Sequence, residues 1–315
     1  MRVATYNMEN FDRHDLGQER AARLGDVIGR LAADILCLQE VSARAPSPQR
    51  DMAHLDALIE GLPCASFARA ATHSDAGDWP RDIHNLVVLS RFPIRKVTQV
   101  HHDLVPAGRY RFLTGASGPE QTLTWDRPAL HVQVDTPLGL LHVINVHLHA
   151  PLASLVPGQK RGPFSWQRCD AWAEGFALSA GKRNGQALEV RLLVDRILDV
   201  SREANIVICG DFNAADREVP VATIRGSIDD TNNPDLAARA LFEVEAAIPK
   251  SRRYTVRHAG RSLMPDHILV SRVLSERLSG AGILNAELAD EHPDFRDPSR
   301  TVASFHAPLY ADFST

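Results

Sequence analysis

The stretch that decides the fold lies in the second half of the chain and reads Ile206-Val207-Ile208-Cys209-Gly210-Asp211-Phe212-Asn213. Its first four residues are all apolar, which predicts a strand that is buried on both faces of a sheet. Gly210 then permits a close approach of the backbone to a neighbour. Asp211 and Asn213 are two residues apart, so in an extended chain they project in the same direction. An acid and an amide are therefore expected together at a strand end.

Two interpretations of this pair remain open. The carboxylate of Asp211 can bind a metal ion or take a proton from water, while the uncharged amide of Asn213 can donate hydrogen bonds to a phosphate oxygen. Asp-Phe-Asn is also typical of a capped turn that leads into a helix.

Strands and helices alternate around this stretch. Apolar runs predict further strands, and apolar residues at helical spacing predict amphipathic helices between them. The strands are expected at residues 3–6, 35–38, 86–90, 268–270 and 308–313, and the helices near residues 24–31, 51–61 and 190–197. Residues 129–134 and 140–146 are expected to form a β-hairpin with the four-residue loop 136–139. Two similar halves of this kind predict an α/β sandwich.

Residues 151–185 interrupt the alternation with glycines, prolines, four aromatic residues and several basic residues. We expect an inserted loop region that faces the substrate, or a local cluster in which the aromatic residues pack over the sheet. The polar motifs run from residue 7 to residue 306 and have to meet. The whole chain, residues 1–315, is therefore expected to be a single domain with this insertion.

The charge of the chain limits its partners. With 35 basic and 39 acidic residues, the formal charge is −4, so there is no general basic excess for nucleic acid. Short runs such as Lys160-Arg161 and Lys182-Arg183 are either a local basic face or solvated surface.

No leader precedes the first predicted strand and no apolar run is long enough to span a bilayer, so we expect a soluble, cytoplasmic protein.

Polar residues follow other predicted strands as well. Glu40 comes after an apolar run, and a glutamate at a strand end is a suitable oxygen ligand for Mg²⁺. Asn145, His147 and His149 alternate at the end of another strand, so they are expected to face one side and line a cleft. Each residue alone is compatible with an ordinary structural role, and it is their accumulation that indicates a site.

Taken in order, seven short motifs resemble those of the endonuclease/exonuclease/phosphatase family. They span nearly the whole chain: Ala4-Thr5-Tyr6-Asn7, Leu38-Gln39-Glu40-Val41, Leu89-Ser90-Arg91-Phe92-Pro93-Ile94, Asn145-Val146-His147-Leu148, Gly210-Asp211-Phe212-Asn213, Asp266-His267-Ile268-Leu269 and Ser304-Phe305-His306-Ala307-Pro308.

The resemblance implies a four-layer α/β sandwich, with two packed mixed sheets flanked by helices, that hydrolyses phosphate esters with Mg²⁺ or Mn²⁺. Glu40 would be the main metal ligand, with Asn7 and Asp211 beside it. The catalytic residues implied by the resemblance are Asp211 for the attacking water, His147 for the phosphate, and His306 oriented by Asp266. Substrate would be bound by Asn213, Asn145 and Asn7.

The chain departs from the family pattern at two places. Phe305 stands where relatives have an acid before the histidine, so one metal held chiefly by Glu40 and water is expected, unless another acid folds back to replace it. The candidates for that replacement are Asp290, Glu291, Asp294 and Asp297. His84-Asn85 stands where some relatives pair an acid with the equivalent of His147, which favours His147 as a phosphate contact over a proton donor.

The sequence leaves three alternative functions open. The first is a metal-dependent phosphodiesterase that acts on nucleic acid, with residues 151–185 contacting the strand. The second is a phosphatase or phosphodiesterase for a small or lipid-derived ester, such as an inositol phosphate or a phospholipid head group. The third is a binding module without catalysis, which the loss of an acid at position 305 permits.

Overall fold

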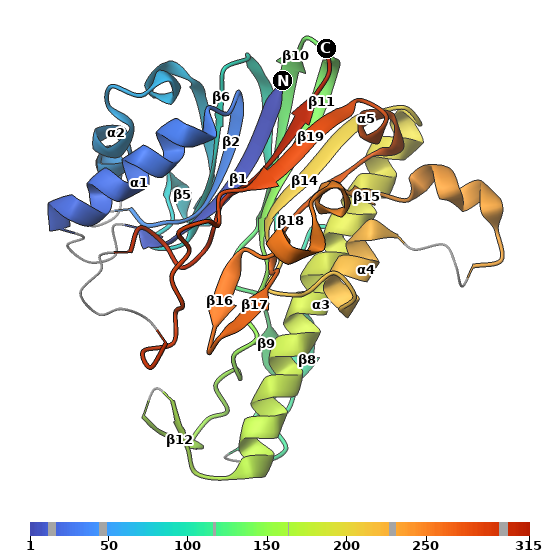
Figure 1. The fold of residues 1–315 in the computed structure, drawn as a ribbon. Coiled ribbons are helices and arrows are strands. Elements are labelled where there is room, and N and C mark those ends of the chain that lie inside the picture. Colours follow the sequence, from blue (N-terminus) through green and yellow to red (C-terminus); the bar gives the residue numbers. More distant parts are fainter. Residues whose placement is uncertain (12–16, 44–48, 116–117, 163, 227–230, 296–301) are drawn as a thin grey trace.

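The computed structural model describes residues 1–11, 17–43, 49–115, 118–162, 164–226, 231–295 and 302–315. Two six-stranded mixed sheets pack face to face, and helices cover their outer faces (Figure 1). The α/β sandwich expected from the alternating strands and helices is confirmed.

The first sheet is built around the parallel pair β1 and β2, and its other neighbouring strands are antiparallel. In spatial order its strands are β19 (Leu278–Ile283), β20 (Leu309–Phe313), β1 (Arg2–Phe11), β2 (Ile35–Val41), β6 (Asn85–Ser90) and β3 (Ala68–Ala71). The last strand of the chain therefore lies beside the first.

The second sheet is built around the parallel pair β11 and β14, with antiparallel strands on both sides. In spatial order its strands are β15 (Phe242–Glu243), β18 (Asp266–Val270), β14 (Asn205–Asp211), β11 (Gly139–His147), β10 (Ala129–Thr136) and β7 (Ile94–Val100). Residues 206–209, predicted to form a buried strand, lie in β14, where they are buried.

Successive side chains along a strand point to opposite faces of the sheet, and this explains the layers. Val3 and Ile35 of the first sheet pack against residues such as Val143 and Val207 of the second sheet. On the outer face of the first sheet, Ala4 and Leu36 pack under α1 (Gly17–Leu31) and α2 (Ala53–Ile59). Helices α3 (Cys169–Val200) and α4 (Val219–Arg225) cover the outer face of the second sheet. Both faces of each central strand are thereby buried.

The remaining elements are short. They are α5 (Arg272–Ser275), the 3₁₀ turns Pro63–Ser66, Pro234–Arg239, Val244–Ala247 and Lys250–Arg252, and four two-stranded ribbons: β4 (His73–Ser74) with β5 (Gly77–Pro80), β8 (Gly108–Tyr110) with β9 (Gln121–Leu123), β12 (Lys160–Gly162) with β13 (Ser165–Trp166), and β16 (Val256–His258) with β17 (Arg261–Leu263). Among the described residues, no helix has both the length and the apolar composition to cross a membrane.

Two expectations about the elements were wrong. The hairpin turn has two residues and not four, because Thr136 already pairs with Gly139. Residues 151–185 are not one long loop, since α3 begins at Cys169 and continues for 32 residues. The first half of α3 extends beyond the sheets together with β8, β9, β12 and β13, and we call this part the arm (Figure 1).

Buried acids on α3 hold the arm in place. The carboxylate of Glu174 accepts hydrogen bonds from the Tyr110 hydroxyl, at 3.0 Å, and from the backbone nitrogens of Leu113 and Thr114. Glu189 accepts in the same way from the backbone nitrogens of residues 102, 104 and 105. The backbone nitrogens concerned lie outside the strands, and these hydrogen bonds satisfy them. The bonds therefore fix residues 102–105 and 113–114 against α3.

Candidate active site

The two parallel pairs bring polar side chains of both sheets to one end of the sandwich. Asn7 pairs with Gln39 in the first sheet, directly before Glu40, and His147 pairs with Asp211 in the second. Because the carboxyl ends of parallel strands meet at one edge, these four strand ends converge where the sheets face each other. The N-terminus marks the start of β1 in Figure 1, so this end of the strands lies toward the arm.

Asn7 joins the acids of the two sheets. Its amide nitrogen lies 3.1 Å from Oε1 of Glu40 and 3.0 Å from Oδ2 of Asp211. His147 Nε2 lies 3.7 Å from Glu40 Oε1 and 3.5 Å from Asp211 Oδ2. The structure therefore brings together all three residues that the resemblance to the family assigned to a metal, with His147 beside them.

The donor atoms of this cluster fit a divalent cation. One atom each from Glu40, His147 and Asp211 lies within 4.8 Å of the others. Carboxylate oxygens suit Mg²⁺, and an added imidazole nitrogen also suits Mn²⁺. His147 Nδ1 is buried and has no hydrogen-bond partner among the described residues, whereas Nε2 lies beside the carboxylates of Glu40 and Asp211.

The backbone around the cluster adopts a conformation that costs energy for any residue other than glycine. Five non-glycine residues here have φ between 49° and 59°, which is the left-handed region. They are Glu9, Asn10, Glu40, His84 and Asn213. Such positions cost about 1–3 kcal/mol each and are common where a side chain must be aimed at a ligand.

Two residues of the cluster have perturbed pKa values. Burial, with the negative charge of Asp266, raises the pKa of Asp211 to about 7. Burial also holds the pKa of His147 well below its usual value, and the positive charge of Arg127 acts in the same direction. His147 is therefore neutral at pH 7 and can offer a nitrogen lone pair.

Asp266 and His306 form the hydrogen-bonded pair that the sequence suggested. His306 Nδ1 lies 2.8 Å from Asp266 Oδ2, which also accepts a 2.6 Å bond from the Thr255 hydroxyl. Burial would lower the pKa of His306, but the carboxylates of Asp266, Asp211 and Glu40 outweigh it and raise this pKa to about 10. The imidazole is therefore positively charged at neutral pH, close to Asp211.

Asp211 and Asn213 form the turn that was the alternative interpretation of Asp-Phe-Asn. The backbone nitrogen of Asn213 donates to Asp211 Oδ1 at 2.8 Å, and its side-chain amide donates to the carbonyl of Leu148 at 2.9 Å. The turn and the site are thus compatible, because Asp211 uses one oxygen for the turn and directs Oδ2 to Asn7 and His147.

Asn145 does not reach the face of the site. Its side chain is fully buried, its amide nitrogen donates to the carbonyls of Leu38 and Val87, and its oxygen accepts from Gln39. The expected contact with substrate is therefore not supported by this geometry, since the side-chain hydrogen bonds of Asn145 to described residues all go to the other sheet. His149 also departs from the expected row, because its ring lies against Asp126 and Ser179.

Among the described residues, none of the proposed replacement acids approaches the cluster. Asp290 caps the backbone nitrogens of Ala259, Gly260 and His292, while Glu291 and Asp294 pair with His258 and His292. Asp297 lies outside the described residues. These side chains serve the β16–β17 region instead.

Sequence reasoning missed Glu9. Its carboxylate accepts a 2.9 Å hydrogen bond from the backbone nitrogen of Phe305, and burial raises its pKa. The charges of His306 and Glu40 also act on it. The signal was present in the sequence, because Glu9 follows Asn7 by two residues, and residues at that spacing in a strand share a face.

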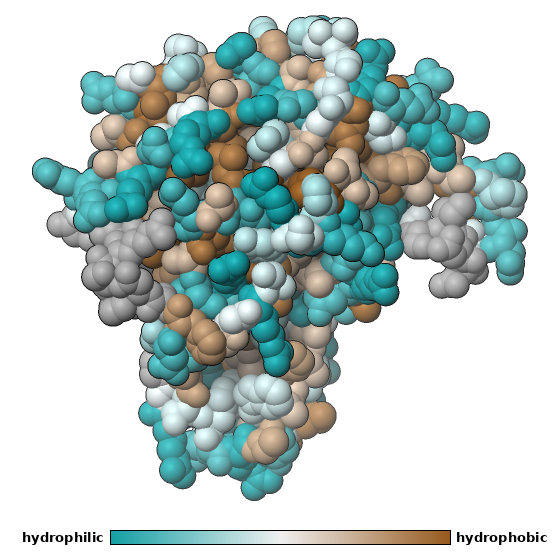
Figure 2. All heavy atoms as spheres, viewed as in Figure 1, coloured by the Kyte–Doolittle hydropathy of each residue, from teal (hydrophilic) through white to brown (hydrophobic). Residues whose placement is uncertain are grey.

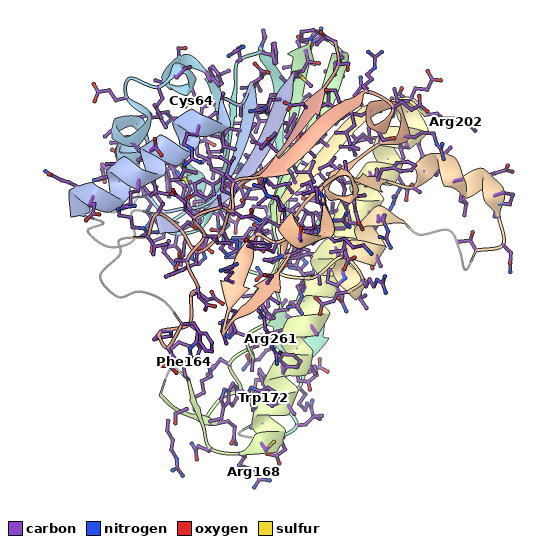
Figure 3. All side chains as sticks on the ribbon, viewed as in Figure 1. Cys64, Phe164, Arg168, Trp172, Arg202 and Arg261 are labelled. Atoms are coloured by element: carbon purple, nitrogen blue, oxygen red, sulfur yellow. The ribbon has the colours of Figure 1, made fainter. Side chains whose placement is uncertain are left out.

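A hollow in the surface begins at His149, two residues after His147 in the chain. It has a volume of about 510 Å³ and is lined by the arm, with apolar Phe112, Leu155 and Leu178 and the basic Lys182 among its residues. On the arm, Phe164 and Trp172 are 87% and 43% exposed, and both are labelled in Figure 3. Figure 2 shows hydrophobic and hydrophilic residues intermingled on this part of the surface.

Acids, an amide and imidazoles are thus gathered at one end of a two-sheet sandwich. The family model described as "Endonuclease/Exonuclease/phosphatase family" matches residues 4–288. The chain belongs to this family of metal-dependent phosphoesterases.

Solved structures show the same fold at low sequence identity. Truncated TDP2 from Caenorhabditis elegans is 15% identical with a TM-score of 0.59, and the alignment covers 100% of this chain and 97% of the other. The 3′ phosphatase NExo from Neisseria, bound to a product DNA hairpin, is 17% identical with a TM-score of 0.57 and full coverage of both chains. TDP2 from D. rerio, complexed with single-strand DNA product, is 14% identical with a TM-score of 0.57, and 100% and 99% of the chains are covered. No curated protein sequence matches this chain.

Proposed function

We propose that this protein is a Mg²⁺- or Mn²⁺-dependent phosphodiesterase that acts on nucleic acid by attack of an activated water. The observation that carries the proposal is the cluster of Glu40, His147 and Asp211, bridged by Asn7 and facing the Asp266–His306 pair. Acids for a cation and a positive imidazole for a phosphate are then present within one site.

In this proposal Glu40 and Asp211 hold the divalent cation, with His147 and Asn7 beside them. When bound, the cation neutralises charge on the phosphate and lowers the pKa of bound water. We also assign Asp211 to the attacking water, which its carboxylate orients and deprotonates.

The other residues act on the phosphate. His306 is positively charged and fixed by Asp266, so its free Nε2 proton is available to a phosphate oxygen or to the leaving group. Asn213 offers an amide at the edge of the turn. Neither role requires a second metal, which agrees with Phe305 in place of an acid.

Three features favour nucleic acid as the substrate. The structural relatives NExo and TDP2 were solved with DNA products. The hollow beside His149 is large enough for a nucleotide, and its apolar and polar lining suits a base. Trp172 stacks on Phe176, with ring centroids 5.3 Å apart, and both are partly exposed, as in a platform for unpaired bases.

A phosphoester panel tests the proposal. Purified protein is incubated with single- and double-stranded DNA, RNA, an inositol phosphate and a phospholipid head-group ester, with Mg²⁺, with Mn²⁺ and with EDTA. We expect metal-dependent cleavage of nucleic acid, a loss of at least 100-fold in Asp211→Asn, and no loss in Asp78→Asn, an exposed acid on β5.

Other results of the panel would point elsewhere. Hydrolysis of the small esters alone would establish the second function, a small-molecule phosphoesterase, in agreement with the formal charge of −4. No hydrolysis of any ester by metal-loaded protein would favour the binding module. Equal cleavage by the wild type and Asp211→Asn would contradict the proposed chemistry.

A further inference from the structure

A buried arginine connects the two sheets beside the cluster. Arg127 is only 6% exposed, and its Nε donates to the carbonyl of His147 at 3.1 Å. A second nitrogen, Nη2, lies 3.4 Å from the carbonyl of Leu148. The third, Nη1, lies 2.7 Å from Nδ1 of His84, which precedes β6 of the first sheet. Arg127 therefore fixes His84 from the opposite sheet.

This contact determines which ring nitrogen of His84 carries the proton. A guanidinium group has donors and no acceptor, so Nδ1 of His84 must accept from it. The neutral ring then carries its proton on Nε2, which lies 3.2 Å from Oδ1 of Asn10. His84 is consequently a donor toward Asn10, and its Nε2 has no lone pair left for a cation.

Asn10 contacts both His84 and Glu40 and so connects them. Its backbone nitrogen donates to Glu40 Oε2 at 2.7 Å, while the side-chain oxygen is held by His84. His84 Nε2 itself is 3.9 Å from Glu40 Oε2, too far for a direct hydrogen bond. His84, Asn10 and Glu40 all have positive φ, so the protein keeps an unfavourable backbone conformation at each of these three residues.

We propose that Arg127 and His84 are positioning residues for Glu40: Arg127 locks His84 as an Nε2–H donor, and His84 holds Asn10 so that Asn10 fixes the Glu40 carboxylate for a divalent cation. The inference rests on the proposed function, because it assumes that Glu40 binds that cation. It differs from direct ligation, in which His84 would offer a lone pair to the cation. Groups that orient a ligand typically change metal affinity 10- to 100-fold when removed.

Two variants separate these roles. Glutamine keeps an acceptor for Arg127 and a donor for Asn10, whereas leucine keeps neither. Mn²⁺ binding to metal-free protein is measured by calorimetry for the wild type, His84→Gln, His84→Leu and the control His73→Leu, an exposed histidine on β4. We expect about 10-fold weaker binding in His84→Leu, and affinities within about threefold of wild type for His84→Gln and the control.

The outcomes distinguish this inference from the proposed function. No Mn²⁺ binding by the wild type would overturn both. Wild-type binding with an unchanged His84→Leu variant would overturn only the inference, and so would equal losses in His84→Gln and His84→Leu, which indicate direct ligation. Should His84→Leu fail to fold, ¹⁵N NMR of wild-type imidazoles decides: a neutral His84 ring protonated on Nε2 is expected, and protonation on Nδ1 would overturn the proposal.

Discussion

Asp211 links the chemistry of the site to the stability of the protein. Its carboxyl group is 2% exposed and surrounded by other acids, so ionisation is unfavourable until a cation is present. A raised pKa means that the folded protein binds a proton that the unfolded chain has already released. Stability therefore falls as the pH rises between the usual value near 3.8 and about 7.

The first prediction follows from this fall in stability with rising pH. We expect the metal-free wild type to lose about 1–3 kcal/mol of unfolding free energy through Asp211 between pH 4 and pH 7, and Asp211→Asn to lack that part of the slope. The variant should also be the more stable protein at pH 7, although it is inactive. Urea unfolding at several pH values in EDTA measures both effects, and parallel pH curves for the two proteins would contradict the argument.

A second prediction concerns Phe305. The backbone nitrogen of Phe305 donates to Glu9, so an acid introduced at position 305 would lie near an existing carboxylate. We expect Phe305→Asp to lower the melting temperature of the metal-free protein by a few degrees, because like charges are brought together, and to increase the stabilisation by Mn²⁺. Thermal unfolding with and without Mn²⁺ is the measurement.

The control for this change is Phe295→Asp, since Phe295 is 58% exposed and its ring lies beside that of His292. It should alter neither the metal-free melting temperature nor the shift with Mn²⁺ by more than about a degree. A Mn²⁺ shift in Phe305→Asp equal to that of the wild type would count against a shortage of acids at this position.

At the scale of the element, β14 depends on a glycine. Gly210 has φ of 141°, and a Cβ atom added there would lie 1.9 Å from the carbonyl oxygen of Val146 on β11. Both the backbone conformation and the close approach exclude other residues. This explains in physical terms why a glycine separates the apolar run from Asp211.

We accordingly expect Gly210→Ala to cost about 3 kcal/mol or more, through strain and the forced separation of β11 and β14. Mn²⁺ affinity should fall as well, because His147 and Asp211 are the last residues of these strands. Gly108→Ala on β8 is the matched control, since its added Cβ would meet no atom of the described residues within 4 Å. Urea unfolding that shows the same loss for both variants would contradict the explanation.

Helix α3 shows where the spacing of apolar residues is insufficient to predict a helix. Only its C-terminal half was predicted, from Val190, Val194 and Ile197, because the N-terminal half lacks a clear apolar stripe. Buried positions there include Glu174, Arg183 and Gln186, which a sequence pattern assigns to the surface. Their burial depends on partners far along the chain, such as Tyr110 and His149, and local periodicity contains no information about these partners.

At the scale of the whole molecule, Asn145 connects the two sheets beneath the site. Its amide nitrogen donates to Leu38 and Val87 of the first sheet at 3.0 and 3.1 Å, and Gln39 donates to its oxygen at 2.7 Å. Removing this side chain leaves buried polar groups of both sheets without partners. Asn145 thus fixes the separation of the sheets at the depth where Glu40 and His147 must meet.

For Asn145→Ala we expect a loss of about 2–4 kcal/mol in unfolding free energy and weaker Mn²⁺ binding, although the residue touches no ligand. Asn205→Ala is the control, because its amide also bonds a carbonyl, that of Leu138, but at the start of β14, the end of the strand away from Asp211. The control should lose about 1 kcal/mol and keep its metal affinity. Equal losses in the two variants would contradict the role of Asn145 between the sheets.

The sequence by itself predicted an α/β sandwich, the strands β1, β2, β6, β11, β14 and β18, and the polar strand ends at Glu40, His147 and Asp211, because apolar runs that end in polar residues are a local pattern. The two packed sheets and the role of Asn7 were implied by the resemblance to the family. Only the tertiary structure decided that Asn145 lies between the sheets, that Glu9 accompanies Phe305, and that Arg127 orients His84. Each of these depends on a hydrogen bond between residues at least 43 positions apart. Such partners are chosen by the packing of the two sheets and not by neighbours in the chain.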